Sequence, residues 1–310
     1  MKTIILIFIL SGSLVFSQPV EVPSYYKTDE NFSRALRNII VDLDLEGNFD
    51  VGEDGTEQIS FAVIDLTGAE PVLGGVNYDN FIYPASVYKM YVAAEVLHQV
   101  SQRKYSLYDE HIVSGHNAVD RSKEIKSDPR PLLSEKDVVT IYYLLDLMIT
   151  RSDNSAANCL IDIAQRPNID YLLHSYGWKG SEVTRKFLKR TVEDSGYENV
   201  RGTESCALHA ADFLFRVYSL KLVNPWVSMQ MLSLLGSQLD KSKIAAGLPS
   251  DVMYYNKTGW FSYWTNDVGI VDDGNVRYII ACFIPLPEKA ALPKFKALSS
   301  RVYELMRSRN

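Results

Sequence analysis

The sequence predicts a mixed α/β (α+β) protein: a mostly antiparallel sheet built from both chain ends, flanked by helices and carrying an inserted all-helical lobe. Short β-rich segments occur at residues 60–66 and again at 251–255, 267–271 and 275–285. Helical patterns fill the chain between them, and no internal repeat or Pro/Gly-rich linker divides it. Strands from the two ends are therefore expected to pair in one sheet.

Local patterns define the individual elements. The run SFAVIDL stops at Thr67-Gly68, and Asp272-Asp273-Gly274 provides a hairpin turn. Helical spacing of apolar residues, with a Ser134-x-x-Asp137 cap before the second helix, predicts helices at 86–100, 137–150, 155–164, 205–220, 226–235 and about 293–307. One domain, residues 18–310, then has a sheet lobe of about 18–85 and 236–310 and a helical lobe of about 86–235.

The first 17 residues have the composition of a cleavable export signal. Lys2 precedes an apolar stretch of about 14 residues, too short for the roughly 20 that span a bilayer, and Ser17 is a small residue at the expected cut. We therefore expect cleavage near Ser17, a periplasmic or secreted protein, and no stable membrane insertion afterwards.

Composition excludes several classes of function. A hydrophobic content of 46% and a charged content of 23% are typical of a globular chain, and a net charge of −6 without Lys/Arg runs argues against nucleic-acid binding. The five histidines lack partners at metal-ligand spacing, so no metal or cofactor is expected. Cys159, Cys206 and Cys282 lie in apolar contexts and are expected to be buried free thiols. No large apolar helix face is left over, which favours a monomer.

A lysine lies in an otherwise apolar predicted helix. Between Ser86 and Leu97 the only charged residues are Lys89 and Glu95. Burying an ammonium group is costly unless it is paired or neutralised, so we expect a lowered pKa for Lys89. Ser86 lies three residues earlier on the same face, at the helix start, which makes the pair a candidate nucleophile and base. Alternatively, Ser86 is a helix cap and Lys89 reaches solvent.

Two further motifs follow in the chain. Ser152-Asp153-Asn154 lies between predicted helices and Lys257-Thr258-Gly259 follows a predicted strand. Each alone is readily explained as a helix cap or a strand end, and S-x-x-K also occurs at Ser24 and Ser101. Together, S-x-x-K, S-D-N and K-T-G in this order are typical of class A β-lactamases and penicillin-binding proteins. With FIYPASVYK and RSDNSAANCL around the first two motifs, the chain resembles a class A β-lactamase-type serine hydrolase over nearly all its mature length.

The resemblance implies a reaction on a small-molecule β-lactam or a cell-wall peptide. Ser86 would be the acylated nucleophile, Lys89 its proton acceptor, and Ser152 the donor of a proton to the leaving nitrogen. The backbone N–H groups of Ser86 and Trp260 would form the oxyanion hole.

The same resemblance implies the binding residues. Asn154 would bind the side-chain amide of the substrate, while Lys257 and Thr258 would hold its carboxylate. Trp260 is bulkier than the residue that the family usually has after K-T-G.

The deacylating glutamate of class A enzymes lies in an E-x-x-L-N string, which this chain lacks. The candidates are Glu182, Glu193 and Glu198. We prefer Glu193, because Arg190 precedes it closely and Val192 could dock the loop inward; the alternative is an exposed loop carboxylate.

The sequence therefore predicts an exported serine β-lactamase that acts through an acyl-enzyme on Ser86. The alternatives are a D,D-peptidase or related cell-wall peptide hydrolase, which needs no water-activating glutamate, and a β-lactam sensor that is acylated once. Glu193 is the feature that separates them.

Overall fold

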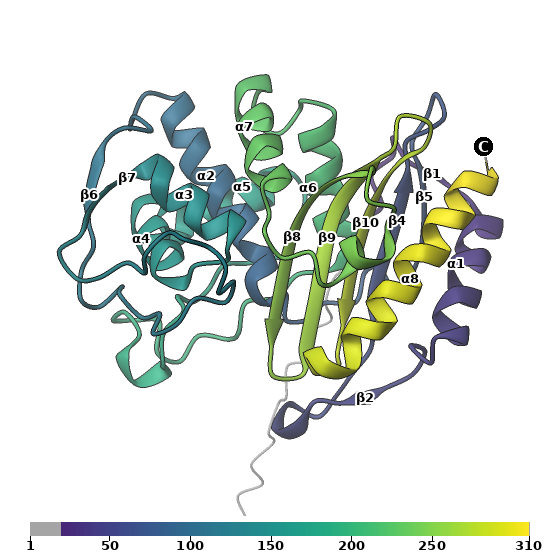
Figure 1. Ribbon diagram of the computed structural model, residues 1–310, viewed down its shortest axis with the longest axis horizontal. Coiled ribbons are helices and arrows are strands. Elements are labelled where there is room, and N and C mark those ends of the chain that lie inside the picture. The colour runs from purple at the N-terminus through teal and green to yellow at the C-terminus, as the bar shows by residue number, and fades with distance from the viewer. Residues whose placement is uncertain (1–19, 310) are drawn as a thin grey trace, which may run out of the picture.

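The computed structural model of the chain describes residues 20–309, so the predicted signal at residues 1–17 lies outside the described part (Figure 1). Its central feature is a six-stranded sheet of strand order β1-β5-β4-β10-β9-β8. β1 and β5 pair in parallel and the other neighbours are antiparallel. The predicted sheet from both chain ends is thus confirmed.

The strands of this sheet are β1 (Lys27–Thr28), β4 (Ser60–Asp65), β5 (Val72–Val76), β8 (Met253–Phe261), β9 (Trp264–Asp272) and β10 (Arg277–Ile284). Two small antiparallel pairs are β2 (Phe49–Asp50) with β3 (Thr56–Glu57), and β6 (Glu110–Ile112) with β7 (Val138–Thr140).

The helices are α1 (Glu30–Asp42), α2 (Lys89–Ser101), α3 (Ile141–Thr150), α4 (Asn154–Ala164), α5 (Arg166–Ser175), α6 (Ala207–Tyr218), α7 (Pro225–Gly236) and α8 (Glu288–Arg309). Short 3₁₀ helices are η1 (Gly52–Asp54), η2 (Ala85–Tyr88), η3 (Arg190–Val192) and η4 (Ile244–Gly247).

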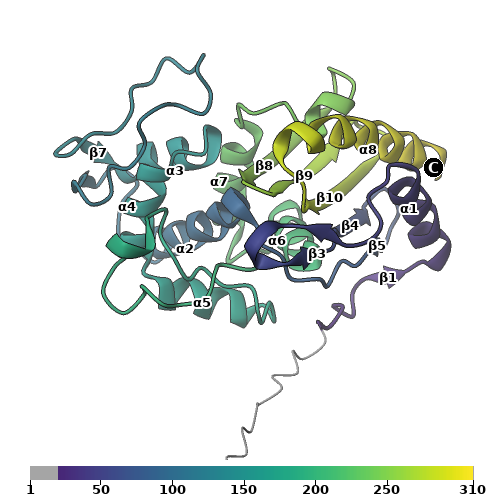
Figure 2. The same cartoon turned by 90° about the horizontal axis from the view of Figure 1, so that it is seen from below.

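The sheet is buried on both faces, which explains why β4 lacks an alternation of apolar and polar residues. Phe61 and Val63 pack into the core under α1 and α8, whereas Ala62 and Ile64 face the core that contains α2 and α6. α1 and α8 lie side by side over the outer face (Figure 1). The second core continues into the helices on the other side of the sheet (Figure 2).

α2 is the central helix of this second core. It contacts α3, α4, α5 and α7, so its whole circumference is covered, as its apolar composition predicts. Its first residue is Lys89, with Ser86 in η2 directly before it. The packing of α2 therefore fixes both residues between the helices and the sheet.

Some predicted boundaries are wrong. Residues 138–140, predicted as helix, form β7, because Val-Val-Thr is a β-branched run; α3 begins after Thr140, whose hydroxyl accepts the Tyr143 N–H at 3.2 Å. The strand predicted to end at residue 255 continues through K-T-G to Phe261. α8 begins at Glu288 and contains Pro293. α1 and α5 were not predicted.

No helix within residues 20–309 is long and apolar enough to cross a membrane. The same residues contain no cluster of three or more His, Cys, Asp or Glu side chains able to hold a metal ion. Cys159, Cys206 and Cys282 are buried free thiols.

Candidate active site

Ser86 lies in η2, in contact with the backbone of β8. It is half-buried, and the preceding residue, Ala85, has a positive φ of 47°. A Cβ at Gly259 would lie 2.7 Å from the backbone nitrogen of Ser86 and 3.0 Å from that of Val87. Only glycine permits this approach, so the glycine of K-T-G brings the edge strand against the Ser86 turn.

The Lys89 side chain is completely buried and aims at the S-D-N loop. Its ammonium donates hydrogen bonds to the Ser152 carbonyl at 2.5 Å and to Asn154 Oδ1 at 2.8 Å, and lies 3.3 Å from the Ser152 hydroxyl. Burial lowers the pKa of Lys89 to about 8, although the carboxylates of Glu124 and Asp120 act in the opposite direction. Lys89 does not reach solvent, and its neutral form is accessible near neutral pH.

Ser152 joins the other two motifs. It has a positive φ of 63° in the turn between α3 and α4, and its hydroxyl accepts a hydrogen bond from the Lys257 ammonium at 3.0 Å. Lys257 is also completely buried, and burial, followed by repulsion from Lys89, lowers its pKa to about 7. The two lysines therefore share one serine hydroxyl, and the first proton lost belongs to the pair.

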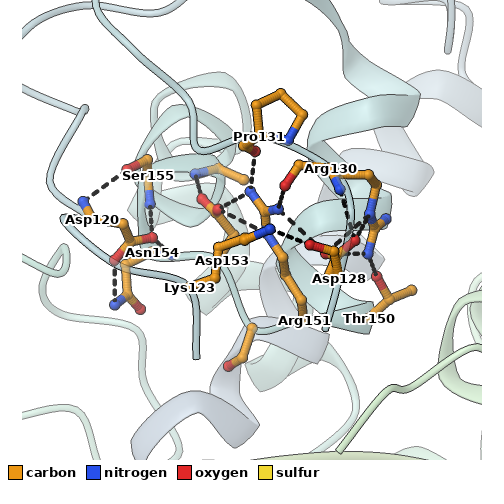
Figure 3. Close-up of polar contacts among 12 residues, drawn as sticks. Asp120, Lys123, Asp128, Arg130, Pro131, Thr150, Arg151, Asp153, Asn154 and Ser155 are labelled. Carbon is orange, nitrogen blue, oxygen red and sulfur yellow. Dashed lines mark hydrogen bonds and ion pairs between the residues drawn. The ribbon is translucent and has the colours of Figure 1, made fainter. Parts of the chain in front are cut away.

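A buried ionic cluster around Arg151 stabilises the S-D-N turn (Figure 3). Arg151 is 1% exposed and binds Asp153 at 2.8 Å and Asp128 at 3.2 Å. It also donates to the carbonyls of Arg130 and Pro131 at 2.8 and 2.7 Å. These bonds fix both neighbours of Ser152 and so its strained backbone.

Asp120 orients Asn154. Its carboxylate accepts the Asn154 backbone N–H at 2.7 Å and the Asn154 side-chain N–H at 3.0 Å (Figure 3). The amide oxygen of Asn154 is thereby turned toward Lys89. Asp120, Asp128 and Arg151 were not among the residues predicted for the site, although Arg151 directly precedes the S-D-N motif in the sequence.

An aromatic ring lies over Lys89. The Lys89 ammonium is 4.2 Å from the centroid of Phe187, which stacks on Tyr88 with ring centroids 5.2 Å apart. The Phe187 backbone N–H donates to Asn158 Oδ1 at 2.8 Å, and Asn158 is completely buried on α4. The loop between α5 and α6 therefore presents a side chain without a proton acceptor to the candidate base.

Glu193 belongs to a separate buried ion-pair cluster. Its side chain is 0% exposed and pairs with Arg166 at 2.7 Å and with Arg185 at 3.5 Å. Among residues 20–309, no hydrogen bond or ion pair joins Glu193 to Ser86 or Lys89.

The surroundings of Glu193 differ from the expectation. Arg190, which precedes Glu193, donates to the Val200 carbonyl, and Val192 is 50% exposed, so it does not dock the loop inward. The alternative of an exposed carboxylate is wrong for Glu193, because its side chain is buried. Glu182 pairs with Arg201, and Glu198 accepts the Gly196 N–H.

The end of β8 forms one side of the site. Thr258 is buried beside Lys257, and Trp260 follows Gly259 with 44% of its surface exposed. The Trp260 indole N–H donates to Glu124 Oε1 at 2.8 Å. Glu124 belongs to residues 113–137, the segment between β6 and β7. Hydrogen bonds thus join Lys89, Ser152, Asn154 and Lys257, and Gly259 holds Ser86 beside them, whereas Glu193 makes its ion pairs with Arg166 and Arg185.

The three motifs meet at the Ser152 hydroxyl, and the fold is that of β-lactamases and of PBP-A. The chain belongs to the beta-lactamase enzyme family, whose model matches residues 44–306. Comparison with curated protein sequences gives no match.

Solved structures share the fold at low sequence identity. PBP-A aligns with a TM-score of 0.75 at 16% identity, over 91% of this chain and 98% of that one. A mutant of PBP-A in an acyl-enzyme complex with penicillin G has a TM-score of 0.74 at 15% identity, over 91% and 98%. A β-lactamase from Sphaerobacter thermophilus has a TM-score of 0.74 at 18% identity, over 89% and 98%.

Proposed function

We propose that the protein is a penicillin-reactive serine enzyme of the D,D-peptidase type, which forms an acyl-enzyme on Ser86 and releases it slowly. The hydrogen-bonded chain Lys89–Ser152–Lys257 beside Ser86 supports the acylation step. The Lys89–Phe187 contact favours slow deacylation over the fast deacylation of a β-lactamase, because the Phe187 ring supplies no general base beside Lys89. The leader at residues 1–17 supports action outside the cytoplasm.

Ser86, Lys89 and Ser152 can account for every proton transfer in the acylation step. Ser86 Oγ attacks the carbonyl carbon while its proton passes to neutral Lys89, and the backbone N–H groups of Ser86 and Trp260 stabilise the oxyanion. The carbon–nitrogen bond then breaks, and the leaving nitrogen takes the Ser152 hydroxyl proton. Lys89, 3.3 Å from Ser152 Oγ, returns the first proton to it.

Substrate orientation follows from the remaining charges. Lys257 would hold the carboxylate that a β-lactam or a D-alanine terminus presents, with Thr258 beside it. An anion on Lys257 keeps that lysine protonated, which leaves Lys89 as the member of the pair that becomes neutral. Asn154, fixed by Asp120, would bind the amide on the acyl side.

Deacylation requires a base that activates water near the ester. The side chain of Phe187 cannot accept a proton, and the Glu193 carboxylate forms ion pairs with Arg166 and Arg185. The acyl-enzyme therefore lacks a dedicated general base and persists, which favours the peptidase over the β-lactamase among the predicted functions.

Intact-protein mass spectrometry with benzylpenicillin tests the nucleophile. We expect one adduct of the full penicillin mass, because ring opening loses no atom, mapped to the peptide containing Ser86. Ser86→Ala should remain unlabelled, whereas the matched control Ser101→Ala, at another S-x-x-K string, should label like the wild type. Labelling of Ser86→Ala, or no adduct on the wild type, would overturn the proposal.

A further inference from the structure

A carboxylate and a half-exposed indole meet at the edge of the candidate site. Glu124 Oε1 accepts the Trp260 indole N–H at 2.8 Å. Trp260 directly follows Gly259, which packs on the Ser86 backbone, while Glu124 is exposed in the segment between β6 and β7. The contact thus lies between the helical side and the sheet side of the molecule, one residue beyond the glycine of β8 that touches Ser86.

The charge of Glu124 acts electrostatically on the two site lysines. It is the strongest of the carboxylates that raise the pKa of Lys89 and of Lys257 against the effect of burial. A substrate carboxylate held by Lys257 therefore lies in the field of an existing anion. A positive charge on the acyl side of the same substrate would neutralise that repulsion.

One exposed aromatic face lies next to this carboxylate. Trp260 is 44% exposed, although large apolar side chains are normally buried. An aromatic face next to a carboxylate favours an organic ammonium ion, which gains both cation–π and ionic attraction. Hydrogen bonding from the indole N–H fixes the carboxylate beside the ring. The combination discriminates between a cationic and a neutral group, which an aromatic surface alone would not do.

We propose that Glu124 and Trp260 form a subsite for a protonated amine on the acyl side of the substrate. The preferred substrate is then zwitterionic, with a carboxylate at the leaving end for Lys257 and an ammonium group for Glu124. A cell-wall peptide that carries a diamino acid with a free amine has this chemistry. This inference rests on the proposed acylation of Ser86.

Two penicillins that differ by one amino group provide the test. Benzylpenicillin and aminobenzylpenicillin are compared at pH 6, where the amine is charged, by the second-order rate constant of acylation. We expect the wild type to prefer the amino compound by roughly fivefold, the size of an exposed ion pair with a cation–π contact. Because the ratio of the two rates is measured, a general effect on Lys89 or Lys257 cancels.

Glu124→Gln should bring the ratio of the two acylation rate constants, aminobenzylpenicillin over benzylpenicillin, to about one. Trp260→Leu should lower this ratio below the wild-type value. Glu135→Gln removes the same charge from an exposed position in the same segment and should retain the preference. A ratio unchanged in Glu124→Gln, or a wild type without preference, overturns the subsite while leaving Ser86 acylation intact. If neither penicillin labels the wild type, the proposed function fails, and the subsite fails with it.

Discussion

The Lys89 ammonium lies 4.2 Å from the centroid of the Phe187 ring. Replacing Phe187 by Glu would place a carboxylate next to Lys89, the candidate base for Ser86. We predict that Phe187→Glu increases the rate of deacylation by about 100-fold, the usual contribution of a general base. The rate is measured as the decay of the penicillin adduct after removal of free penicillin.

The control for this variant is Phe187→Leu, which also removes the ring but supplies no base. Its adduct should decay at nearly the wild-type rate. Equal acceleration in both variants would show that the ring acts by excluding water, and that the missing base is not the reason for slow release.

Glu193 is predicted to be structural. Glu193→Gln removes the buried charge that faces Arg166 and Arg185 and leaves Arg166 with Asp194 as its ion-pair partner. The change should therefore lower the free energy of unfolding by about 3 kcal/mol in urea titration. The lifetime of the acyl-enzyme should be unchanged. A Glu193→Gln variant that is stable but retains its adduct much longer than the wild type would restore Glu193 as the deacylating base.

The paired lysines predict a bell-shaped pH profile of acylation. Burial lowers the pKa of Lys89 to about 8 and that of Lys257 to about 7, so the pair loses its first proton in this range. Acylation should rise with pH there, because one neutral lysine is needed as the base, and should fall at higher pH when the second proton leaves and the carboxylate loses its partner. A flat profile from pH 6 to pH 9 would contradict a lysine base.

Asp128 is predicted to stabilise the S-D-N turn. Although burial alone would raise its pKa, hydrogen bonds from Arg130 and Arg151 hold the pKa of Asp128 at about 2. Asp128→Asn should therefore lower the free energy of unfolding by about 3 kcal/mol at pH 7. Since the folded-state pKa is depressed, this contribution is present above pH 4 and is lost as the pH falls towards 2.

The measurement is urea unfolding of both proteins across that pH range. The difference between wild type and variant should shrink as Asp128 becomes protonated. A difference that stays constant down to pH 2 would show that shape, and not the charge of Asp128, matters.

The sequence was most informative where chemistry demands unusual residues. The position of Lys89 in an apolar helix predicted its burial and lowered pKa, and the glycine of K-T-G is explained by its approach to the Ser86 backbone. The extent of β8 was underestimated, because Lys257 and Thr258 interrupt an apolar pattern although both are buried against the serine loop.

Phe187 could not be predicted from its neighbours in sequence. Its place over Lys89 depends on a backbone hydrogen bond to Asn158, a residue 29 positions earlier on another element. The partners of Glu193 were missed for the same reason: Arg166 begins α5, far from the loop that Glu193 occupies. Ion pairs between distant segments leave no periodic signal.

The lifetime of the penicillin adduct on the wild-type protein tests the central claim most directly. Intact-protein mass spectra are recorded over time after a short excess of benzylpenicillin, and hydrolysed penicillin is counted per protein molecule. We predict one adduct on Ser86 that outlasts the free penicillin, with about one penicillin consumed per chain in that period. Many penicillins hydrolysed per chain, with free enzyme regenerated at once, would contradict the account.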